Sequence, residues 1–150
     1  MSELSDLYQE VILDHSKHPH NYHTIEGASL KAEGYNPLCG DKVTVFLKMA
    51  GDKIVDIGFQ GSGCAISKSA ASVMTDEVKG KTKAEAENLI EKFRELVTGA
   101  KADQPSAEEL GKLAVFSGVC EFPTRVKCAI LSWHTLHAAL ANPAKTVTTE

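Results

Sequence analysis

Three cysteines lie far apart in the chain, and the residues around each are typical of a metal ligand. Cys39 lies between a proline turn and an aspartate, Cys64 follows a glycine-rich turn, and Cys128 follows a lysine. Thiolates are the ligands that zinc and iron-sulfur clusters prefer, and Asp41 adds a carboxylate two residues after the first thiol. If these four side chains bind one ion, the fold must bring three distant segments together.

The length and composition indicate one globular domain. The chain has 150 residues, of which 43% are apolar and 24% are charged, which suits one hydrophobic core. A net charge of −4 argues against general nucleic-acid binding, which needs a basic surface. We find no signal peptide pattern and no apolar stretch long enough to span a bilayer. We therefore expect a cytoplasmic protein with no nucleic-acid or membrane partner, whose reduced cysteines are metal-binding, reactive or buried.

Alternating apolar residues predict a small antiparallel sheet. Two segments, 42–49 and 54–60, have apolar residues at every second position. The break at Ala50-Gly51-Asp52 between them indicates a hairpin. A shorter strand near 29–35 would complete a three-stranded meander.

Apolar residues three and four positions apart predict helices before and after these strands along the chain. The sequence thus predicts an α+β fold, in which a small three-stranded antiparallel sheet packs against several helices. We expect a single domain over 1–150, with a core over about 4–141 and a frayed tail after Pro143. We expect five helices. The first begins at Ser2 or Ser5 and ends before Pro19, the second covers 65–78, and the third runs from a capping box of Thr82 and Glu85 to Gly99. A shorter fourth helix begins at Ser106, and the last begins near Pro123.

Cys39 and Asp41 belong to a loop that leads into a predicted strand. In an extended segment, residues two apart point to the same side, so both side chains can reach one ion. The alternative is an ordinary turn in which Asp41 only caps backbone amides.

Cys64 precedes the helix predicted over 65–78. The positive end of the helix dipole favours a thiolate there, and the glycines let the backbone approach an ion closely. The alternative is a glycine-rich strand-to-helix turn with a buried thiol.

Cys128 is predicted to lie away from the apolar stripe of the last helix, which includes Ile130 and Trp133. A merely structural cysteine would more often share that stripe. Lys127 could hydrogen-bond to a bound sulfur, although most lysines at such positions are solvated. Cys120 is either a fourth thiol ligand or a plain thiol in a loop, and we place it outside the site.

The histidines match no zinc spacing. Four of them form a cluster within 15–23, and His134 and His137 lie on the last helix. We expect His137 on the apolar face, and we interpret both helical histidines as core or surface residues. The sequence contains no phosphate loop, nucleophile elbow or metalloprotease helix motif.

With these residues in view, the chain resembles the SufU branch of the IscU/NifU-type iron-sulfur cluster assembly proteins. The resemblance covers roughly residues 4–141, and its motifs follow one another in the family's order. They are an N-terminal pattern within 8–21, the first metal motif at 36–41, the second at 61–67 and the third at 123–129.

Three departures from the IscU pattern favour the SufU branch. Lys127 stands where scaffold-type IscU proteins have a histidine before the third cysteine. Residues 121–125 stand where those proteins have a Leu-Pro-Pro-Val-Lys segment that chaperones recognise. The interval between Cys64 and Cys128 is also longer than in IscU, and Cys120 matches no ligand position of the family.

The resemblance implies a zinc site made by Cys39, Asp41, Cys64 and Cys128, and a fold that agrees with the predicted one. It also implies that the protein accepts sulfur from a PLP-dependent cysteine desulfurase of the SufS type. We therefore predict a zinc-dependent sulfurtransferase that uses Cys39 as the sulfur acceptor and serves the downstream iron-sulfur assembly machinery. One alternative is a scaffold on which iron and sulfur form a [2Fe–2S] cluster on the same ligands. The other is a structural zinc-binding module.

Overall fold

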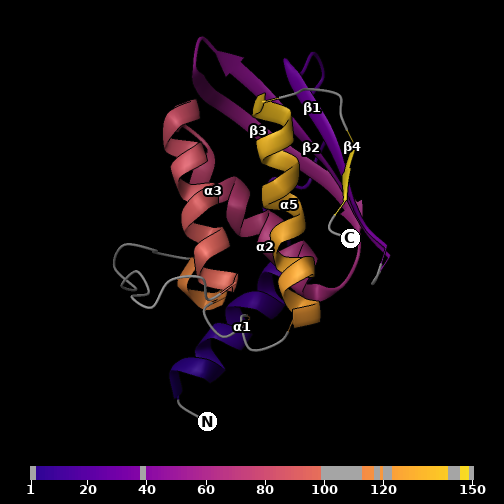
Figure 1. Cartoon of the computed structure of the whole chain (residues 1–150), viewed down its shortest axis with the longest axis vertical. Coiled ribbons are helices and arrows are strands. Elements are labelled where there is room, and N and C mark those ends of the chain that lie inside the picture. Colours follow the sequence, from indigo (N-terminus) through magenta and orange to yellow (C-terminus); the bar gives the residue numbers. More distant parts are fainter. Residues whose placement is uncertain are drawn as a thin grey trace.

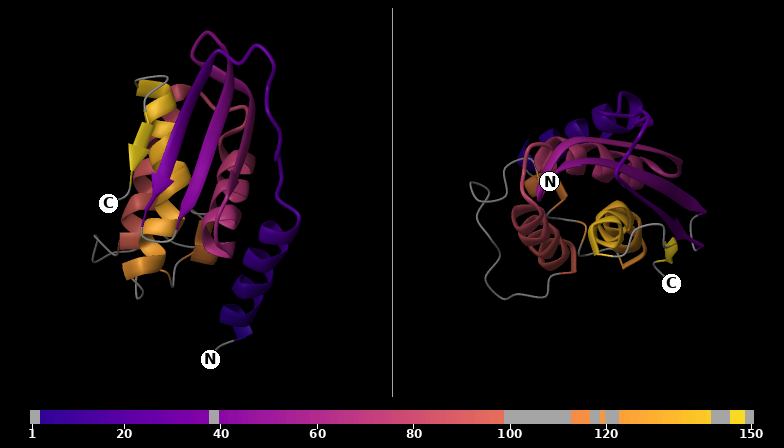
Figure 2. Two further views of the ribbon diagram at one scale, coloured as in Figure 1. Left: turned by 90° about the vertical axis from the view of Figure 1, so that its right-hand side faces the viewer. Right: turned by 90° about the horizontal axis from the view of Figure 1, so that it is seen from above.

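A curved sheet and the helices packed against it form the body of the protein (Figure 1). The structure is a computed structural model, and it describes residues 3–37, 40–98, 113–116, 119, 123–141 and 146–148. Helices α2 and α5 contact the sheet, α3 packs against α5 and α2, and α1 packs against α2. Seen from above, the sheet curves around α5 (Figure 2).

The sheet contains the three predicted antiparallel strands. These are β1 (Leu30–Asn36), β2 (Asp41–Ala50) and β3 (Lys53–Ser62). β2 pairs antiparallel with both β1 and β3, and the β2–β3 hairpin turns at Gly51, whose φ of 62° suits glycine. The α+β prediction and the three-stranded antiparallel sheet are therefore confirmed.

A fourth strand was not predicted. β4 (Thr146–Thr148) pairs parallel with β1, which gives the sheet order β3-β2-β1-β4. We expected a frayed tail after Pro143, but Thr146–Thr148 instead completes the edge of the sheet. A strand of three residues is too short for an apolar alternation to reveal it.

The helices that the structure describes are α1, α2, α3 and α5, and they agree with the predicted ones. The capping box at the start of α3 is present, because Thr82 Oγ1 accepts from the Glu85 N–H at 3.2 Å and Glu85 Oε1 accepts from the Thr82 N–H at 3.0 Å. The helix expected from Ser106 lies outside the described residues. The bounds are Glu3–Lys17 for α1, Ala65–Val78 for α2, Lys83–Thr98 for α3 and Pro123–Ala141 for α5.

The hydrophobic core has α5 at its centre. The Trp133 ring stacks on Phe93 of α3 at 4.6 Å between ring centroids, and Phe116 meets Phe93 edge to face. All three rings are fully buried. Because α5 lies between the sheet and α3, it is buried on nearly every side over 128–140. The core thus holds this helix in a fixed position relative to β1 and β2.

The burial of α5 corrects two expectations that assumed one apolar stripe. Cys128, which we placed away from the stripe, is buried. His137, which we placed on the apolar face, is exposed, and its Nδ1 lies 2.8 Å from Glu87 Oε2 of α3. A helix that is covered by a sheet on one side and by a helix on the other has no single apolar stripe.

Among the helices that the structure describes, none is both long and apolar enough to cross a membrane.

Candidate metal site

Asp41 is the buried carboxylate of the candidate site. It is the first residue of β2, pairs in register with Asn36 at the end of β1, and is 0% exposed. Its Oδ1 accepts from the Cys64 N–H at 2.9 Å, and its Oδ2 accepts from the Asn36 amide at 3.1 Å. Because a buried carboxylate needs compensation, these hydrogen bonds explain its position but supply no positive charge.

Cys64 lies at the N-terminal end of α2. It is the N-cap residue of that helix, and its Sγ accepts from the Ser67 N–H at 3.4 Å. A glycine is required immediately before it, because a Cβ at Gly63 would lie 2.5 Å from Asp41 Oδ1. This close approach of the backbone lets the Cys64 amide reach the Asp41 carboxylate.

Cys128, on α5, places its sulfur beside Asn36, the residue that also contacts Asp41. Only 3% of Cys128 is exposed, and the Asn36 Nδ2 atom lies 3.6 Å from its Sγ. The Asn36 amide therefore donates toward both the Asp41 carboxylate and the Cys128 sulfur. It is itself fully buried, and it links the end of β1 to the start of β2 and to α5.

The three described ligands converge. One ligand atom each from Asp41, Cys64 and Cys128 lies within 4.8 Å of the others, a separation that one coordinated ion can bridge. Two thiols and a carboxylate are a donor set that zinc accepts. In the part of the chain that the structure describes, no lysine or arginine forms an ion pair with Asp41. The buried carboxylate and the two sulfurs thus fit a divalent cation.

Three of the four predicted ligands, Asp41, Cys64 and Cys128, lie close together, and their role in binding a metal stays a prediction. The alternative for Asp41, a cap on backbone amides, is also partly right, because its Oδ1 accepts from the Cys64 N–H. Cys39 and Cys120 lie outside the described residues, so the role of Cys39 as a ligand stays a prediction. The described neighbours of Cys39, Pro37 and Gly40, belong to the turn that Gly40 closes by donating to the Asn36 carbonyl at 2.9 Å.

Asn36 is the site residue that the sequence analysis missed. It belongs to the first motif, but nothing in that motif distinguishes an amide that donates to ligands from an ordinary turn residue before a proline. The available signal was its pairing position: a strand that ends at residue 36 and another that begins at 41 place the two side chains opposite each other.

Comparisons with known proteins agree with this fold and place the chain in a family. Residues 7–129 match the family described as the NifU-like N-terminal domain. The iron-sulfur cluster assembly scaffold protein IscU of Streptococcus pyogenes serotype M1 is 42% identical over 96% of this chain and 89% of its own length. The zinc-dependent sulfurtransferase SufU of Bacillus subtilis is 37% identical over 93% of each chain. The chain is a SufU-type member of the IscU/NifU family.

A solved structure shows the same fold in this family. The crystal structure of the protein called FiSufU, from Fervidobacterium islandicum AW-1, superposes with a TM-score of 0.81 at 41% identity. The match covers 87% of this chain and 94% of that one. The family resemblance that the motifs indicated is therefore confirmed over most of the chain.

Proposed function

We propose that this protein is a zinc-dependent sulfurtransferase, which accepts sulfur from a cysteine desulfurase for iron-sulfur cluster assembly. The observation that carries the proposal is the convergence of Asp41, Cys64 and Cys128. The family membership supports the assembly role, and the relative from Bacillus subtilis is named as a zinc-dependent enzyme of this kind.

Four residues would hold the ion: the three that converge and Cys39. Bound zinc would keep the thiolates deprotonated at neutral pH, where a free thiol is only a few per cent ionised. Asp41 and Cys64 are fixed to each other by a hydrogen bond, and Asn36 donates toward Asp41 and Cys128. These three ligands therefore keep their places when the fourth is exchanged.

Cys39 is the residue that we propose accepts sulfur, after a group of the desulfurase takes its place as a ligand. Its thiolate attacks the outer sulfur of a persulfide on the desulfurase. A sulfur–sulfur bond forms on Cys39 while the corresponding bond on the partner breaks, and the partner's cysteine leaves as a thiolate. The exchange needs no oxidant or reductant, because one persulfide replaces another.

The partner that this chemistry requires is a PLP-dependent cysteine desulfurase of the SufS type, which converts cysteine sulfur into an enzyme-bound persulfide. The acceptor of the next step is a component of the iron-sulfur assembly machinery. Both partners would meet the protein in the cytoplasm, where thiols stay reduced.

The test is a comparison of Cys39→Ser with Cys120→Ser in the presence of desulfurase and cysteine. Mass spectrometry of the Cys39 peptide measures persulfide formation, cysteine turnover measures stimulation, and elemental analysis measures zinc. We expect the wild type and Cys120→Ser to gain a persulfide on Cys39 and to stimulate the desulfurase. Cys39→Ser should do neither, and full stimulation by this variant would overturn the proposal.

A second candidate is a scaffold on which a [2Fe–2S] cluster is built and then transferred. It rests on the 42% identical relative, which is named as a scaffold protein, and it uses the same ligands for iron. Anaerobic reconstitution with iron and sulfide distinguishes the two functions. A labile cluster that passes to an apo-ferredoxin would favour the scaffold, whereas zinc that iron does not replace would favour the sulfurtransferase.

A further inference from the structure

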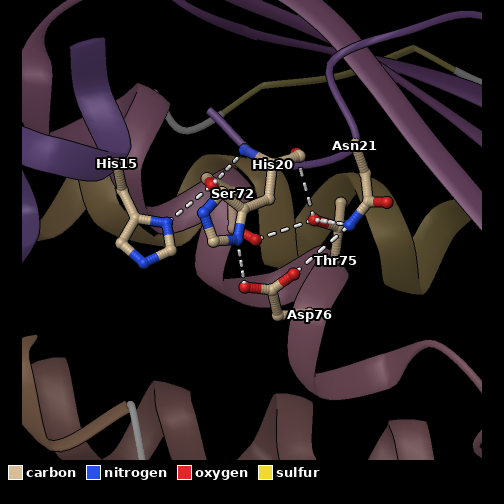
Figure 3. A network of polar contacts seen from close by, with 6 residues as sticks. All are labelled: His15, His20, Asn21, Ser72, Thr75 and Asp76. Carbon is tan, nitrogen blue, oxygen red and sulfur yellow. Dashed lines mark hydrogen bonds and ion pairs between the residues drawn. The ribbon is translucent and has the colours of Figure 1, made fainter. Parts of the chain in front are cut away.

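A second cluster of polar side chains lies on α2, away from the cysteines (Figure 3). It joins three parts of the chain: α1, the segment that follows it, and α2. Its members lie close together because α1 packs against α2. They are His15, His20, Asn21, Ser72, Thr75 and Asp76.

The Ser72 hydroxyl is the centre of this cluster. It lies 2.7 Å from His15 Nδ1 and accepts from the His20 backbone N–H at 2.7 Å. His15 is 5% exposed, so its ring is held against α2 with little freedom. This contact orients the His15 ring so that its Nδ1 faces Ser72 and His20 (Figure 3), as outer partners orient the histidines that bind metals.

Asp76 fixes the second imidazole. Its Oδ2 lies 2.6 Å from His20 Nδ1, and its Oδ1 accepts from the Asn21 amide at 3.4 Å. The Asn21 amide also donates to Thr75 Oγ1 at 3.0 Å. The carboxylate is therefore oriented from two sides, beside both histidines.

The distances suit a shared ion. One ligand-type atom each from His15, His20 and Asp76 lies within 4.8 Å of the others. The two imidazole rings are 4.4 Å apart between centroids, at an angle of 45°. The two rings and the Asp76 carboxylate therefore lie near one point in space.

The cluster is also open to solvent on one side. The His20 side chain is 44% exposed and the Asp76 side chain is 20% exposed, while His15 lies behind them. An ion can therefore enter past His20 and Asp76 without opening the contact between α1 and α2.

We propose that His15, His20 and Asp76 form a second metal site, which binds a divalent transition-metal ion of the zinc, cobalt and ferrous iron class. Two imidazoles and one carboxylate are the donors that such ions accept without thiolates. Binding replaces the contact between His20 Nδ1 and Asp76 Oδ2. Because an existing hydrogen bond must be given up, this site binds more weakly than the cysteine site.

The second site is separate from the first. Cys64 caps the start of α2 and Asp76 lies near its end, twelve residues later, which is about 18 Å along the helix axis. The two sites therefore use different residues, and each can bind its ion without the other. The second site does not depend on the proposal that the protein is a sulfurtransferase.

The test is a titration of metal-free, reduced protein with Co²⁺, because cobalt reports its own ligands. Thiolate ligands give an intense charge-transfer band in the near ultraviolet, and histidine and carboxylate ligands give only visible bands. The variants are His20→Gln and Asp76→Asn, which leave the His20 backbone hydrogen bond to Ser72 in place. The matched control is His18→Gln, an exposed histidine outside the cluster.

We expect the wild type and His18→Gln to bind two equivalents of Co²⁺, one with the charge-transfer band and one without it. His20→Gln and Asp76→Asn should each lose the equivalent without the band and keep the other. A single equivalent in the wild type that carries the charge-transfer band would overturn the second site. Two equivalents in all four proteins would overturn it too, because the second ion would then lie elsewhere. Loss of the charge-transfer band alone would count against the cysteine site only.

Discussion

The cysteine site and the histidine cluster lie at the two ends of the same helix, but their polar groups are satisfied in different ways. At the start of α2, Asp41 is fully buried and receives hydrogen bonds from Asn36 and Cys64, without an ion pair among the described residues. Towards the end of α2, Asp76 already contacts an imidazole that can carry a positive charge. Among the described residues, the first carboxylate thus has hydrogen bonds but no cationic partner, whereas the second contacts an imidazole.

Under our two metal-site proposals, this difference predicts one tightly held ion and one exchangeable ion. Where a buried carboxylate has no cationic partner among the described residues, a bound metal ion would offset the cost of burying it. Where the chain supplies its own partners, an ion must compete with them. We therefore expect the cysteine site to hold its ion more firmly than the histidine cluster holds its own.

The largest effect should come from Asp41→Ala, which removes the carboxylate on which the cysteine site is built. We expect zinc affinity to fall by more than the roughly hundredfold that loss of an outer partner costs. Competition with a chromophoric chelator measures the affinity. Asp52→Ala, an exposed residue of the β2–β3 turn, is the control and should bind zinc normally. If Asp41→Ala binds zinc as tightly as the wild type does, the buried carboxylate is not what distinguishes the cysteine site from the histidine cluster.

Asn36→Ala should weaken zinc binding by about ten- to a hundredfold, because the amide orients two ligands without being one. The same competition assay applies, with circular dichroism to confirm that the variant folds. Asn88→Ala on the exposed face of α3 serves as the matched control. If Asn36→Ala folds and binds zinc as the wild type does, the amide has no part in the site.

Ser72→Ala should act on stability and leave the cysteine site intact. The hydroxyl joins His15 to the backbone of His20, and loss of a buried hydrogen-bonding partner costs about 1 to 3 kcal/mol. Urea unfolding of the metal-free protein measures the loss, and Ser16→Ala, whose hydroxyl donates to a carbonyl within α1, is the control. A parallel fall in zinc affinity would show that the two ends of α2 are not independent.

The smallest effect concerns pH. Burial lowers the pKa of His134 below its ordinary value of 6.5, and the positive charges of His137 and Arg94 lower it further. The unfolded chain therefore binds this proton more readily than the folded one, so stability should fall as the pH drops below 6.5. His134→Gln should reduce this loss in urea unfolding at a series of pH values, while His18→Gln should not. If the free energy of unfolding of His134→Gln depends on pH as that of the wild type does, His134 is not the group that causes the loss of stability.

Much of the fold was predictable because its signals are local. The β2–β3 hairpin follows from alternation around Gly51, and the start of α3 follows from Thr82 and Glu85, whose capping hydrogen bonds need only one turn of chain. The position of Cys64 at the start of α2 follows from the glycines before it. The grouping of Asp41, Cys64 and Cys128 followed from ligand chemistry and from the family's motifs.

The features that were missed depend on contacts between distant segments. The burial of Cys128 follows from the position of α5 between the sheet and α3, which a search for a single apolar stripe does not reveal. His15 and Ser72 are 57 residues apart, and they meet only because α1 packs against α2. The roles of the Asn36 amide and of β4 likewise depend on which strands become neighbours.

The place of β4 in the sheet has a consequence for the order in which the protein is made. β1 is among the first elements to leave the ribosome, but the strand that covers its outer edge over Glu33–Tyr35 comes from Thr146–Thr148. Until those residues emerge, the edge can pair with another chain. Chains that stop short of Thr146 should therefore be the ones that aggregate.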